Sequence, residues 1–107
     1  MLVQVAQIMR QKVRLSDVLG RYAGDELTLL LPETDSSGAI PFAERIRKQI
    51  ESTEFSGADQ PLRFTISAGV ASFPEIAATK VDELLSKADE ALYRAKASGR
   101  NRIERAF

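Results

Sequence analysis

The chain has 107 residues, of which 44% are hydrophobic and 28% charged, the composition of one small globular domain. Its 15 basic and 15 acidic residues leave no net charge, so nothing points to a nucleic acid or an anionic membrane as partner. Cysteine and histidine are absent, which excludes disulfides, thiolate nucleophiles and the usual neutral-pH base. Any metal would be held by carboxylate and backbone oxygens, which suit magnesium, manganese or calcium.

An amphipathic helix is predicted at the start of the chain, where Leu2, Ala6, Met9 and Val13 recur at helical spacing. No capping residue precedes it, which favours a chain cut from something longer. The segment lacks the features of a signal peptide, and no apolar run approaches the length of a membrane span. We therefore expect a cytoplasmic location.

A hairpin is predicted next. Val18–Ala23 and Glu26–Leu31 read as two strands, and Gly24-Asp25 supplies the turn because both residues tolerate turn dihedrals. The second strand is almost continuously apolar, which indicates burial on both faces.

The rest of the chain alternates helices and strands. A helix is predicted over about Ala39–Ser52, and a long strand over Arg63–Phe73. Thr79 and Asp82 would form a capping box for a second long helix, which Ser98-Gly99 ends. A last strand is predicted over Arg102–Phe107. The basic side chains of the first long helix are expected to point mostly outward; these are Arg45, Arg47 and Lys48.

The order α-β-β-α-β-α-β predicts one α/β (α+β) domain over residues 1–107, with helices covering a largely antiparallel sheet. A ferredoxin-like palm would normally have one more strand before the first helix. That strand is missing here, so we expect a partial domain.

Two adjacent carboxylates, Asp25 and Glu26, sit at the tight hairpin. Carboxylates at a hairpin tip could hold a divalent cation, which commonly accompanies phosphate. A solvated turn is the more common explanation of so short a pattern.

Several segments in order resemble one family. RYAGDEL at 21–27 resembles the RYGGDEF signature hairpin of the GGDEF family of diguanylate cyclases; FAERI, FTISAGVA and ADEALYRAKASGRN resemble the later segments of that family. The resemblance implies a palm fold that condenses two GTP molecules into cyclic di-GMP and pyrophosphate across a dimer of domains. It also implies Mg²⁺ (or Mn²⁺) as cofactor and a sensory domain upstream.

The resemblance assigns roles to residues of the hairpin. It makes Asp25 a metal ligand and proposed base, and Glu26 the second acid beside the metal. Ala23 and Gly24 would form the turn close to the nucleotide. Ala23 replaces a glycine of the family, from which we expect reduced rather than abolished function, and Leu27 replaces a phenylalanine.

Two cations and an RxxD sequence complete the implied sites. Lys96 and Arg100 match the family's phosphate-binding pair, although cations also favour the C-terminal end of a helix for its dipole alone. Arg14 and Asp17 match the family's product-inhibition site, which Arg45 joins. Without the resemblance, Arg14 and Asp17 would read as an ordinary surface ion pair.

The family's first strand carries further metal, phosphate and guanine ligands that these 107 residues do not supply. We therefore expect the isolated chain to be inactive. Two alternatives stay open: a cyclic di-GMP receptor that works through the RxxD site, and a non-catalytic fragment that oligomerises by strand exchange.

Overall fold

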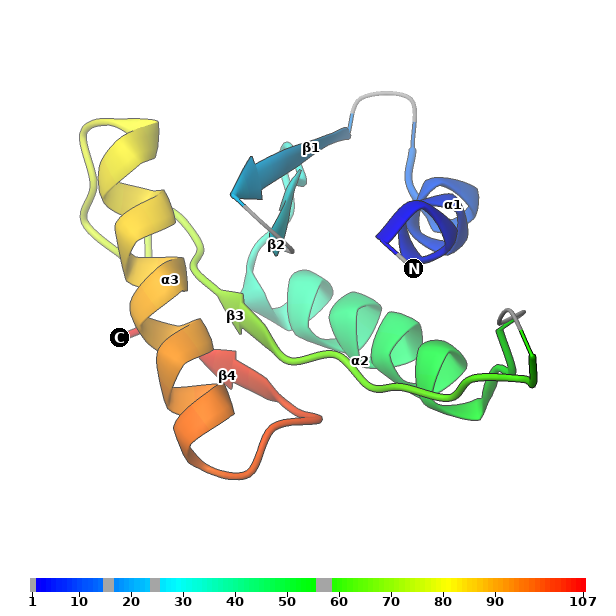
Figure 1. Ribbon diagram of the computed structural model, residues 1–107. Helices are drawn as coiled ribbons and strands as arrows, with labels where there is room; N and C mark the ends of the chain where they lie inside the picture. Colours follow the sequence, from blue (N-terminus) through cyan, green and yellow to red (C-terminus); the bar gives the residue numbers. More distant parts are fainter. Residues whose placement is uncertain (1, 15–16, 24–25, 56–58) are drawn as a thin grey trace.

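A computed structural model describes residues 2–14, 17–23, 26–55 and 59–107. These residues form three helices and four strands in the predicted order. The bounds are α1 Leu2–Lys12, β1 Val18–Ala23, β2 Glu26–Leu30, α2 Ser36–Ser52, β3 Ala68–Val70, α3 Val81–Ala97 and β4 Ile103–Arg105 (Figure 1). None of the described helices is long and apolar enough to cross a membrane.

The strands form two separate two-stranded sheets. β1 and β2 pair antiparallel, with Leu19 opposite Leu29 and an irregularity between Arg21 and Ala23. β3 and β4 pair in parallel, with Gly69 opposite Glu104. The expected largely antiparallel sheet is therefore wrong for the second pair, because β4 returns alongside β3 after the crossover helix α3.

β3 is much shorter than the strand predicted over residues 63–73. Only Ala68–Val70 pair with β4, and Phe64–Ser67 continue without a ladder partner among the described residues. The alternating pattern is still used, because Phe64 and Ile66 pack against the core. A strand pattern thus predicts which face is buried, but a ladder needs a neighbouring strand.

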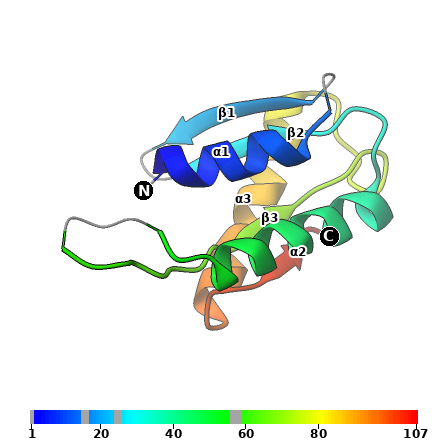
Figure 2. The same cartoon turned by 90° about the vertical axis from the view of Figure 1, so that its right-hand side faces the viewer.

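The interior divides into two clusters. One lies between α1 and α2 and is built from Val5, Ile46, Ile50 and Phe55, with Leu27 of the hairpin against it. α1 lies beside the hairpin and above α2 (Figure 2). The other cluster joins α3 to the second sheet and consists of Ile76, Ala91 and Ala106.

Gly69 lets α3 lie directly on β3. A Cβ atom at this position would stand 2.0 Å from the carbonyl oxygen of Ala88 and 2.4 Å from the amide nitrogen of Leu92. Both are backbone atoms, which cannot swing aside as a side-chain end can. Ala91 and Ala95, further along the same helix, are also small and buried.

α2 begins three residues before the predicted start. Asp35 caps it and accepts a hydrogen bond from the Gly38 N–H at 3.2 Å. The Ser37 hydroxyl and the Gly38 N–H lower the pKa of Asp35, because both donate to its ionised form. The sequence pattern missed this start because Asp35 and its neighbours read as a polar link.

Arg47 does not point freely outward as predicted, since its side chain is only 12% exposed. Its Nη1 donates to the Asn101 Oδ1 at 2.8 Å, and Glu44 and Glu51 pair with its guanidinium. The hydrogen bond from Arg47 lowers the pKa of Glu44. Arg47 therefore ties α2 to the loop that precedes β4.

The predicted capping box at Thr79 and Asp82 is wrong. Lys80 is the residue before α3 and makes no side-chain cap. Glu83, one residue beyond the expected partner, instead accepts hydrogen bonds from the N–H and the hydroxyl of Thr79, at 3.2 and 2.9 Å. Because α3 starts one residue later than predicted, the acidic side chain that bonds back to Thr79 is Glu83 rather than Asp82.

We predict that Gly69→Ala lowers the free energy of unfolding by about 3 kcal/mol or more, because a backbone clash forces α3 away from β3. Gly20→Ala is the matched control, since a Cβ there meets nothing within 4 Å. Urea unfolding of both variants measures the difference. Equal stability of the two variants would contradict the close packing of α3 on β3.

Candidate functional site

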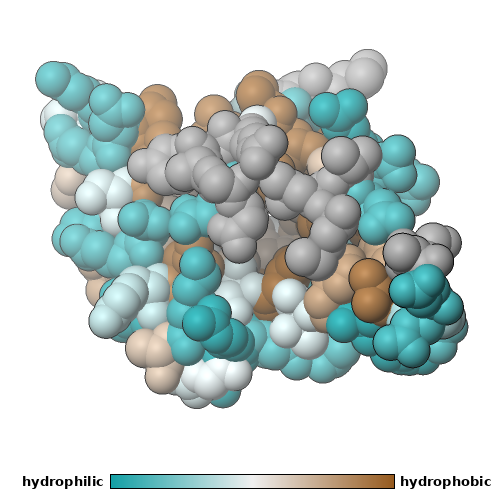
Figure 3. All heavy atoms as spheres, in the orientation of Figure 1, coloured by the Kyte–Doolittle hydropathy of each residue, from teal (hydrophilic) through white to brown (hydrophobic). Residues whose placement is uncertain are grey.

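A large groove of about 1150 Å³ runs between β2 and β3, and we name it the central groove. Every residue from 26 to 35 and from 64 to 73 lines it. Because successive side chains of a strand point to opposite faces, a groove lined by every residue runs along the strand edges. Figure 3 shows patches of hydrophobic residues on this face, with hydrophilic residues beside them.

Glu26 and Lys96 meet across this groove. Glu26 begins β2 and Lys96 lies in the last turn of α3. The Glu26 Oε2 and the Lys96 Nζ are 3.8 Å apart, and both side chains keep part of their surface exposed. Arg100 lines the same groove. The structure thus places one predicted acid and both predicted phosphate-binding cations along one groove.

The rest of the predicted catalytic hairpin is only partly described. Gly24 and Asp25 lie outside the residues that the structure describes. Ala23 ends β1, and its backbone pairs with Glu26 just after the irregularity in the ladder.

A strained loop presents Arg100. Arg100 and Asn101 have φ angles of 63° and 50°, and residues other than glycine seldom adopt this left-handed backbone conformation. Asn101 holds the loop: its N–H donates to the Ser67 hydroxyl at 3.1 Å, and its side-chain amide donates to Glu51 at 2.6 Å. Together with the hydrogen bond from Arg47, these contacts hold the loop at several points and so stabilise the strained backbone.

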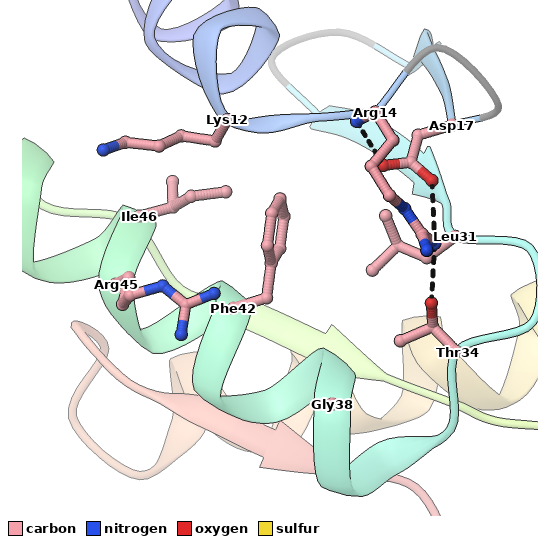
Figure 4. A pocket seen from close by; sticks show the side chains of 9 residues that line it. All are labelled: Lys12, Arg14, Asp17, Leu31, Thr34, Gly38, Phe42, Arg45 and Ile46. Carbon is pink, nitrogen blue, oxygen red and sulfur yellow. Dashed lines mark hydrogen bonds and ion pairs between the residues drawn. The ribbon is translucent and has the colours of Figure 1, made fainter.

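Arg14, Asp17 and Arg45 line a second cavity of about 260 Å³, which we name the Arg14 pocket. The residues around it are Lys12, Arg14, Asp17, Leu31, Thr34, Gly38, Phe42, Arg45 and Ile46. In Figure 4 the Phe42 ring stands between Lys12 and Arg45 on one side and Arg14 on the other. The structure therefore gathers all three predicted residues of the product-inhibition site around one cavity.

Arg14 and Asp17 are tightly paired but differ in exposure. The Arg14 backbone N–H and its Nη2 both donate to the Asp17 carboxylate, at 2.8 and 3.3 Å. The Asp17 side chain is 2% exposed, while that of Arg14 is 59% exposed. In this conformation Arg14 is largely open to solvent, whereas the buried Asp17 carboxylate holds it in place.

Six of the nine residues around the Arg14 pocket were not predicted, and three of these six bring an aromatic or polar side chain: Phe42, Lys12 and Thr34. Phe42 lies one helical turn before Arg45, whose guanidinium carbon is 5.8 Å from the ring centroid. That spacing was visible in the sequence and could have indicated a shared face. Lys12 and Thr34 reach the pocket from segments outside α2, and no local pattern signals this.

The two sites differ in the chemistry that they allow. The central groove offers a carboxylate beside two cations, which suits a phosphate chain with a divalent cation. Among the described residues, no three acidic side chains gather closely enough to hold a metal ion. The Arg14 pocket offers two guanidinium groups and an aromatic ring, which suit a phosphate and a stacked base.

Comparisons with known proteins agree with these features. The family model described as diguanylate cyclase, GGDEF domain, matches residues 1–102. Diguanylate cyclase A of Treponema denticola is 36% identical over 102 residues, which are 95% of this chain and 27% of that protein. Diguanylate cyclase DgcM of Escherichia coli (strain K12) is 39% identical over 102 residues, 95% of this chain and 24% of that protein.

A solved structure gives the same result for the fold. The diguanylate cyclase SiaD of Pseudomonas aeruginosa, in complex with its activator SiaC, superposes with a TM-score of 0.87 at 34% identity; the match covers 98% of this chain and 40% of that one. The chain thus spans well under half the length of these relatives. It belongs to the diguanylate cyclase GGDEF-domain family.

Proposed function

We propose that these residues belong to a diguanylate cyclase, which joins two GTP molecules into cyclic di-GMP and releases pyrophosphate. The pairing of Glu26 with Lys96 in the central groove, with Arg100 beside it, is the observation that carries this proposal. In the reaction, the 3′-oxygen of each GTP attacks the α-phosphorus of the other, and the bond to the β-phosphate breaks. Two such attacks close the ring and release two pyrophosphates.

The residues of the central groove would bind the negatively charged triphosphate and remove a proton. Lys96 and Arg100 would hold the triphosphate, while Asp25, which the resemblance makes the base, would take the proton of the attacking hydroxyl. Lys96 pairs with Glu26 in the structure. A triphosphate would offer Lys96 a stronger partner, and Glu26 would then be released toward a cation.

The donor set fits Mg²⁺ or Mn²⁺, because it consists of carboxylates without nitrogen or sulfur. Glu26 and, by the resemblance, Asp25 would hold the ion, which when bound neutralises phosphate charge and polarises the α-phosphate. The resemblance places further metal, phosphate and guanine ligands on a strand that these 107 residues do not supply. We therefore propose that residues 1–107 alone do not complete the reaction.

The surroundings of the domain follow from the chemistry. Two GTP molecules must meet, so we propose that a second copy of the domain faces the groove and that an upstream sensory domain controls this pairing. We place the domain in the cytoplasm, where GTP is made.

The Arg14 pocket supports a second function, the binding of cyclic di-GMP. Arg14 and Arg45 lie around one cavity, and Arg14 is exposed toward it. Guanidinium groups suit both the phosphates and the acceptor edge of guanine. The domain would then act as a product-sensing module whether or not it is catalytic.

We predict that Lys96→Ala, in the longer protein that contains residues 1–107, lowers kcat/KM for GTP by about 100-fold, because one charged phosphate contact is lost. Lys87→Ala is the control, since Lys87 lies on the same helix and pairs with Glu90 at 3.6 Å. Chromatographic detection of cyclic di-GMP measures turnover. Unchanged turnover of Lys96→Ala would argue against the phosphate role, and turnover by the isolated 107-residue chain would overturn its proposed inactivity.

We predict that Arg14→Ala weakens the binding of cyclic di-GMP to this chain by about 30-fold or more, because a charge-assisted contact is lost. Arg63→Ala is a close control: Arg63 is 60% exposed and forms one ion pair, with Glu54. Titration calorimetry measures both affinities. If the two variants bind equally well, the Arg14 pocket is not the dinucleotide site.

A further inference from the structure

We propose that Thr34 is a positioning residue of the Arg14 pocket, which holds the Arg14 guanidinium in the orientation that meets the dinucleotide. This inference rests on the proposed binding of cyclic di-GMP in that pocket. Thr34 lies in the connection between β2 and α2, far in sequence from Arg14.

The contacts of one nitrogen atom carry the proposal. The Nη2 of Arg14 donates to the Thr34 Oγ1 at 2.9 Å and to the Pro32 carbonyl oxygen at 2.9 Å. It also approaches the Asp17 Oδ1 at 3.3 Å. Three acceptors from two segments thus surround one end of an otherwise exposed guanidinium. Figure 4 shows two of them, Asp17 and Thr34, on either side of the Arg14 guanidinium.

The Thr34 hydroxyl makes two hydrogen bonds, and toward Arg14 it acts as the acceptor. It donates its own proton to the Pro32 carbonyl oxygen at 3.2 Å. Its lone pairs are therefore left to accept from Arg14. A valine has nearly the same shape but can neither donate to Pro32 nor accept from Arg14, whereas a serine can do both.

Thr34 is itself held in place. Its methyl group lies 3.1 Å from the position that a Cβ of Gly38 would occupy, so it packs closely on the first turn of α2. The next residue, Asp35, caps that helix. The backbone that carries the hydroxyl is thus anchored beside the cap of α2, and Thr34→Ser leaves this anchor unchanged.

Fixing the arginine matters for affinity. A free arginine side chain loses considerable rotamer entropy when a ligand immobilises it. Thr34 and the Pro32 carbonyl impose part of that cost on the folded chain before a ligand arrives. Loss of the hydroxyl should then weaken binding without changing the stability of the fold.

The test is calorimetric titration of the 107-residue chain with cyclic di-GMP. Thr34→Val should bind about tenfold more weakly than the unaltered chain, the effect expected for one lost hydrogen bond to a charged group. Thr34→Ser should bind within about twofold of it, because the hydroxyl remains. Thr79→Val is the control: it also loses a hydroxyl hydrogen bond, to Glu83, but far from the pocket.

Each outcome decides the question. Weak binding by Thr34→Val, rescue by Thr34→Ser, and melting temperatures equal to that of the unaltered chain support the positioning role. If Arg14→Ala loses binding while Thr34→Val retains it, the inference is wrong and the site stands. If Thr34→Ser is as weak as Thr34→Val, the hydroxyl has no such role. If the unaltered chain binds no cyclic di-GMP, the site and the inference both fall.

Discussion

The arrangement of the whole structure depends on one constraint: β2 and β3 each have one edge whose backbone N–H and C=O groups pair with no strand among the described residues. β2 pairs with β1 on one edge and β3 pairs with β4 on one edge, and the other edges face the central groove. Strand edges carry rows of N–H and C=O groups that favour pairing with a further strand. Among the described residues no strand occupies this position, so the two small sheets are joined by helices and by the core between α1 and α2 rather than by a ladder.

Both candidate sites follow from this arrangement. The central groove brings Glu26, at the start of one sheet, within reach of Lys96, on the helix that covers the other. The Arg14 pocket adjoins this groove, where the end of α1 faces the first half of α2. Five residues line both sites, namely Leu31, Thr34, Gly38, Phe42 and Ile46. A molecule bound in the Arg14 pocket would therefore contact side chains that also line the central groove.

Much of the fold could be predicted from periodicity, and the failures have physical causes. The bounds of β1 agree, and the apolar stripes of α2 and α3 are buried as expected at Ile46, Ile50 and Ala91. The length of β3 could not be predicted, because a ladder depends on a neighbour and not on the strand itself. The burial of Arg47 and of Asp17 depends on distant partners that no local pattern reveals. The residues of the two sites came from the family resemblance, whereas Thr34 came from the geometry alone.

Amide hydrogen exchange, resolved by residue with NMR, tests the open edge of β3 most directly. The Ala68 N–H bonds to the Arg102 carbonyl at 3.0 Å, and by alternation the Gly69 N–H points toward the central groove. The account predicts that the protection factor of Gly69 in the 107-residue chain is at least about tenfold lower than that of Ala68. Equal and high protection of Gly69 and Ala68 would show that the edge is paired, as in a strand-exchanged oligomer, and would contradict the open groove.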